Sequence, residues 1–78
     1  MAEDPREKAA RLAETLKERG HAGAAEGVAA AVEHGLLRGL RDALQSALTA
    51  IEAIDPVSAG MIDELRLEVD KRLGAPHS

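Results

Sequence analysis

Four of the five hydroxyl side chains in this sequence lie outside the C-terminal tail and are candidate nucleophiles. They are Thr15, Ser46, Thr49 and Ser58. The first three fall inside predicted helices, and Ser58 falls in the first turn of one, where helix capping accounts for it. No spacing in the sequence pairs a serine with a histidine and an acid, although such groups come together only in the fold. We therefore predict that the chain is not an enzyme and has no catalytic residues.

Metal binding would require histidine and carboxylate side chains about one helical turn apart. His21 lies in a predicted turn and His77 in the C-terminal tail, while His34 directly follows Glu33 and points in a different direction on a helix. The His-Glu-x-x-His pattern is absent, and so is cysteine. We predict no metal site and no cofactor. In one continuous helix, Glu33 would fall on the same face as the leucine residues that follow it. Because burial of an unpaired charge is costly, Glu33 would then have to form an ion pair, lie at the edge of that face or lie in an interface.

The composition narrows the class of protein. The chain has 78 residues, 45% of them hydrophobic, no aromatic residue and a formal net charge of −4. This length fits a single helical domain over residues 1–78, with frayed ends at 1–4 and 74–78. No apolar run resembles a signal peptide or could span a membrane, so we expect a cytoplasmic protein without membrane contact. The frequent alanine, glycine and arginine are typical of a GC-rich bacterial genome.

Apolar periodicity predicts an all-α fold of three helices, over residues 5–19, 22–54 and 56–73, that form a bundle or hairpin. Asp4 and Pro5 suit the start of the first helix, and Gly20 suits its end. The predicted buried face of the first helix consists of Ala9, Leu12, Ala13 and Leu16. That of the last consists of Met61, Ile62, Leu65, Val69 and Leu73.

The middle helix has a clear second half and an ambiguous first half. One face of the second half is apolar and consists of Leu36, Leu37, Leu40, Leu44, Ala47, Leu48, Ile51 and Ile54. The first half is rich in alanine, and the sequence leaves open whether the helix breaks at Gly35. A small residue at every fourth position favours one long helix, because it would form a single ridge against which another helix could pack. The ridge consists of Gly23, Gly27, Ala31, Gly35, Gly39, Ala43 and Ala47.

The supply of large apolar residues is small for a chain of this length. Besides Met1 there are ten Leu, four Val, three Ile and Met61. Because association with another chain would bury more apolar surface, we predict a homo-oligomer, with a dimer favoured. The predicted interface residues are Gly27, Ala31, Gly35, Gly39 and Ala43 of the ridge, together with Leu67, which lies off the apolar face of its helix.

Two charged surfaces offer candidate partner sites. Residues 52–70 carry six acids and one base, which predicts an acidic docking surface for a basic protein partner. The members of this surface are Asp63, Glu64, Glu68 and Asp70. A smaller basic face, formed by His34, Arg38 and Arg41, could bind an anion or a nucleic acid. Nucleic-acid binding is disfavoured, because the basic face is small and stacking on bases requires aromatic side chains.

These observations predict a small non-enzymatic helical interaction module. We expect it to act as a regulatory, inhibitory or accessory subunit through protein–protein contacts. The alternative is a nucleic-acid-associated regulator that uses the arginine face of a helical dimer.

Overall fold

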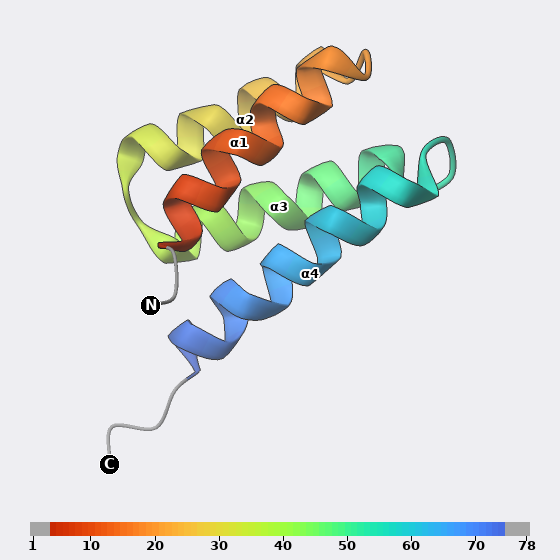
Figure 1. Ribbon diagram of the computed structural model, residues 1–78. Helices are drawn as coiled ribbons and strands as arrows, with labels where there is room; N and C mark the ends of the chain where they lie inside the picture. Colours follow the sequence, from red (N-terminus) through yellow and green to blue (C-terminus); the bar gives the residue numbers. More distant parts are fainter. Residues whose placement is uncertain (1–3, 75–78) are drawn as a thin grey trace.

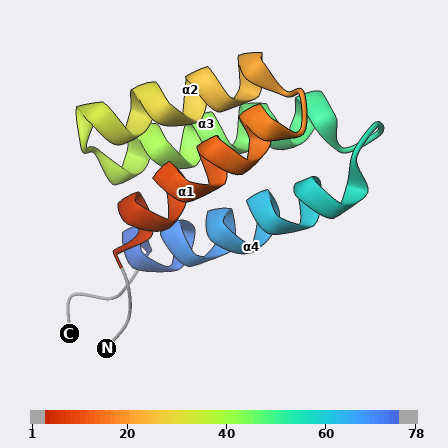
Figure 2. The ribbon, with the colours of Figure 1, turned by 45° about the horizontal axis from the view of Figure 1, so that its top comes forward.

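The computed structural model describes residues 4–74, and this part of the chain contains four α-helices and no strand (Figure 1). The helices are α1 (Pro5–Glu18), α2 (Ala22–His34), α3 (Leu37–Ile51) and α4 (Pro56–Leu73). Short turns make successive helices antiparallel, and α1 packs against both α2 and α4 (Figure 2). The arrangement is an up-and-down four-helix bundle, which confirms the predicted all-α class.

The first and last helices begin where the sequence predicts. The Asp4 carboxylate accepts a hydrogen bond of 2.8 Å from the backbone N–H of Arg6, and Pro5 occupies the first helical position. At the other end of α1, Gly20 adopts a left-handed φ of 87° and His21 N–H donates to the Leu16 carbonyl at 2.8 Å. Asp55 caps α4 in the same way as Asp4 caps α1.

The prediction of one long middle helix over residues 22–54 is wrong. Gly35 has a φ of +75°, a left-handed conformation that ends α2, and its N–H donates to the carbonyls of Ala31 and Val32. Leu36 is extended and α3 begins after it. Residues 52–54 form a turn rather than a last helical turn. The four-residue spacing of small side chains therefore crosses a helix boundary and does not build one ridge.

The core lies between all four helices. Leu40, Leu44 and Ile51 of α3 are buried as the leucine stripe predicts, whereas Leu36 and Ile54 are exposed because they lie in turns. The buried apolar residues are Ala9, Leu12, Ala13, Leu16, Ala25, Val28, Ala31, Leu40, Leu44, Ala47, Ile51, Ala59, Ile62, Leu65 and Val69. Four helices of one chain thus surround the core, whereas the sequence predicts three helices and a second copy.

The predicted frayed ends lie largely outside the described residues. His77 and residues 1–3 and 75–78 belong to this undescribed part. Asp4 and Gly74 are described, and they are the N-cap of α1 and the C-cap of α4. Within residues 4–74, no helix combines the length and apolar character needed to cross a membrane.

Candidate functional site

Asp55 is the centre of the densest polar cluster in the bundle. Its carboxylate accepts hydrogen bonds from Arg19 at 2.8 and 3.1 Å, from the Ser58 backbone N–H at 3.1 Å and from the Ser58 hydroxyl at 2.7 Å. His21 Nε2 lies 3.0 Å from the same carboxylate. The Arg19 guanidinium, followed by His21 and Ser58, holds the pKa of the Asp55 carboxyl well below its usual range. Asp55 is therefore ionised at neutral pH and joins the α1–α2 turn to the start of α4.

This cluster does not have the geometry of a hydrolytic site. Ser58 is fully buried, and its hydroxyl donates to Asp55 rather than to a histidine ring. His21 also contacts Asp55 rather than Ser58, and the lowered pKa of the Asp55 carboxylate makes it a weak base toward the serine hydroxyl. The hydroxyls of Thr15 and Thr49 donate to the carbonyls of Arg11 and Gln45 in their own helices. The residues 4–74 hold no group of three or more metal-ligating side chains.

The predicted acidic surface on α4 is largely paired within the fold. Lys8 lies 3.0 Å from Glu68, Arg66 lies 2.7 Å from Asp63, and Arg41 lies 3.6 Å from Asp70. Glu64 is exposed and forms no ion pair with a described residue. The acidic segment is thus close to neutral where α1 and α3 lie against α4.

The predicted basic face is divided between two helices. His34 lies in the last turn of α2, and Arg38 lies in the first turn of α3; both are exposed. Arg41 lies against Asp70 and, at 3.7 Å, against Asp42. Of these three basic residues, His34 and Arg38 are exposed to solvent. Neither has a carboxylate of residues 4–74 within ion-pair distance.

The predicted interface residues lie in several environments. Gly27 and Gly39 are exposed, and a Cβ atom added to either would meet no atom within 4 Å. Ala31 is buried in the core and Ala43 is half-buried. Gly35 forms the turn after α2, where its carbonyl accepts a 2.7 Å hydrogen bond from Arg6 Nη1. Leu67 is 53% exposed on α4.

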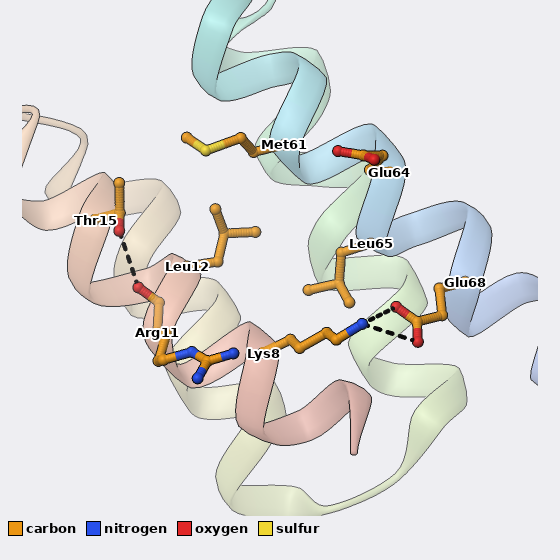
Figure 3. Close-up of a pocket in the computed structure, with 8 residues that line it drawn as sticks. All are labelled: Lys8, Arg11, Leu12, Thr15, Met61, Glu64, Leu65 and Glu68. Carbon is orange, nitrogen blue, oxygen red and sulfur yellow. Dashed lines mark hydrogen bonds and ion pairs between the residues drawn. The ribbon is translucent and has the colours of Figure 1, made fainter. Parts of the chain in front are cut away.

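A groove of about 350 Å³ lies between α1 and α4 (Figure 3). Leu12, Leu65 and Met61 line its apolar part, and Lys8 reaches across to Glu68 at one end. Leu12 and Leu65 are almost completely buried, so the groove offers a partner little apolar area beyond Met61. At that end, the positive charge on the α1 wall and the negative charge on the α4 wall neutralise one another through the Lys8–Glu68 pair.

A larger groove of about 510 Å³ lies between α1 and α2. We call it the alanine groove, because Ala10, Ala13, Ala22, Ala25, Ala29 and Val32 line it. Four charged residues complete its lining: Glu14 and Lys17 on α1, and Glu26 and Glu33 on α2. The three glutamates are exposed, and within residues 4–74 none of them forms an ion pair.

The alanine groove is not among the sites predicted from the sequence, where Glu33 stands out only as a charged residue on an apolar face. The signal that could have found the groove is the composition of α2, in which Glu26, Glu33 and His34 are the only residues other than Ala, Gly and Val. A helix with so few polar residues is usually covered over most of its surface by other parts of a structure. Comparison with protein-family models, with curated proteins and with solved structures finds no match for this chain.

Proposed function

We propose that this chain is a non-catalytic helical interaction module that acts as a regulatory, inhibitory or accessory subunit. The observation that carries the proposal is the exposed side of α2. Most of its exposed residues are small and uncharged: Ala22, Gly23, Gly27, Ala29 and Ala30, beside Glu26, Glu33 and His34. The exposed side of α1, by contrast, is mostly charged: Glu7, Ala10, Arg11, Glu14, Lys17 and Glu18.

Exposed glycines in α2 add to this support. Gly23 and Gly27 each cost a helix up to about 1 kcal/mol relative to alanine. Neither is needed for packing inside the chain, since nothing lies within 4 Å of the position of a Cβ atom. Small side chains on an outer face do, however, let a second backbone approach closely. A partner that covers α2 would account for both the apolar composition and the glycines.

The nucleic-acid alternative has less support. Phosphate binding depends on clustered unpaired cations, and Arg41 is engaged by Asp70. Retention on a heparin column that weakens steeply with salt would favour this alternative. We expect the chain to pass through heparin without retention.

Affinity capture tests the proposed function. The immobilised chain should retain a protein partner from its source cell in stoichiometric amount. Ala30→Glu, on the exposed side of α2, should abolish retention, whereas Ala50→Glu, on the exposed side of α3, should preserve it. If no protein is retained, or if both variants retain it equally, this function for α2 is wrong.

A further inference from the structure

We propose that the alanine groove binds a basic amphipathic helix of a partner protein. This inference rests on the proposed function and adds to it the place of binding and the chemistry of the partner. The groove is larger and more apolar than the one between α1 and α4, and it runs beside the α2 side chains that lack cover.

The floor of the groove is shaped for large apolar side chains. The alanine side chains on both walls are short, and they therefore leave space above the contact between α1 and α2. The α2 wall extends from Ala22 to Glu33, which at 1.5 Å per residue is about 16 Å or three helical turns. A helix that places leucine-sized residues at positions i, i+3, i+4 and i+7 along one face would fill such a groove.

The charged residues that line the groove determine which charge a bound helix should carry. Glu14 stands on one side and Glu26 and Glu33 on the other, against the single cation Lys17. Glu26 and Glu33 are seven residues apart, so two turns of a bound helix would pass both. Lysine or arginine on the flanks of the apolar face would meet these carboxylates, whereas acidic flanks would be repelled.

A second copy of this chain fits the groove poorly. Within residues 4–74, the large apolar residues that its helices leave exposed are Val57, Met61 and Leu67 of α4. Val57 and Met61 share one side of that helix with the exposed Glu64, whose charge the glutamates of the groove would repel. Two alanine grooves face to face would also oppose glutamates to glutamates. A nucleic acid would meet the same repulsion at its phosphates.

Fluorescence anisotropy with two synthetic probes tests the inference. The first probe is a labelled peptide of leucine and lysine, about 18 residues long, with leucine at helical spacing. The second replaces every lysine with glutamate. At about 0.15 M salt, we expect saturable binding of the lysine probe and at least tenfold weaker binding of the glutamate probe. Equal binding of both probes, or no binding of the lysine probe, would overturn the inference.

A matched pair of charge-reversed variants locates the binding. Glu26→Lys with Glu33→Lys changes the groove, and Glu52→Lys with Glu64→Lys changes exposed acids outside its lining by the same net charge. The groove variant should bind the lysine probe about tenfold more weakly, and the control variant less than threefold more weakly. Equal losses, or a larger loss in the control, would overturn the groove as the site. The proposed function would still stand in that case if the captured partner depended on Ala30, so the two failures can be told apart.

Discussion

Arg19 Nε lies 2.8 Å from Asp55 Oδ2, and this contact ties together two turns that are 36 residues apart in the chain. At the opposite end of the bundle, Arg6 Nη1 lies 2.7 Å from the Gly35 carbonyl oxygen. Each end thus has an arginine of the α1 region bound to an element distant in sequence. These contacts fix α1 relative to the rest of the bundle, and thereby the walls of the alanine groove.

Replacement of Asp55 by asparagine should destabilise the bundle. The variant loses the ionic contact with Arg19 and one of the two oxygens that accept hydrogen bonds from Arg19 and Ser58. We expect the melting temperature to fall by roughly 5–10 °C, as followed by circular dichroism. Glu52→Gln, at an exposed position nearby, is the control and should change it little. An unchanged melting temperature for Asp55→Asn would show that the cluster does not stabilise the fold.

The same carboxylate should make stability depend on acid pH. The folded-state pKa of Asp55 lies below its ordinary value of 3.8. Its contribution is therefore complete well above pH 3.8, and it is lost as the pH falls from there towards the folded-state pKa. Melting curves between pH 7 and 2 should show the difference between the native chain and Asp55→Asn shrinking below about pH 4. A constant difference over this range would contradict the lowered pKa.

Replacement of glycine by alanine should change the free energy of unfolding in opposite directions at Gly35 and Gly27. Gly35→Ala places a side chain in a left-handed turn and should lower the free energy of unfolding by roughly 1–2 kcal/mol. Gly27→Ala, in the exposed interior of α2, should raise it by about 0.5–1 kcal/mol. Urea titration monitored by circular dichroism measures both. Destabilisation by Gly27→Ala would mean that this glycine has a structural role inside the chain.

Homodimerisation through Leu67 stays a prediction that solution mass can test. Light scattering with refractive-index detection suits a chain without aromatic residues. A dimer should have twice the chain mass of 8.2 kDa. Leu67→Glu should reduce it to the monomer and leave the helical circular-dichroism spectrum unchanged, because this side chain is exposed on α4. A native chain that measures 8.2 kDa would contradict the predicted dimer and its interface.

Strongly amphipathic segments are the part of the fold that sequence could predict. Leu40 and Leu44 are buried as their spacing requires, because an apolar face of period 3.6 has one energetically favourable orientation. Gly35 illustrates the opposite case. A glycine is compatible with both a helix interior and a left-handed stop, and the fold decides between them through contacts such as the one with Arg6.

Charge patterns in the sequence were less informative about surfaces. Counting charges over residues 52–70 suggested an acidic face, but Lys8, Arg19 and Arg41 lie far away in sequence and close in space. The alanine groove is hidden for a related reason. It is formed jointly by α1 and α2, so the composition of α2 alone indicates an apolar helix but not which neighbouring helix forms the second wall.

Nuclear magnetic resonance mapping of the lysine probe on the isotope-labelled chain tests the central claim most directly. The backbone amide signals of residues 10–17 and 22–33 should shift progressively with added probe, while those around Glu64 and Leu67 on α4 remain in place. Shifts centred on α4, or the absence of any saturable shift, would contradict the assignment of partner binding to the groove between α1 and α2.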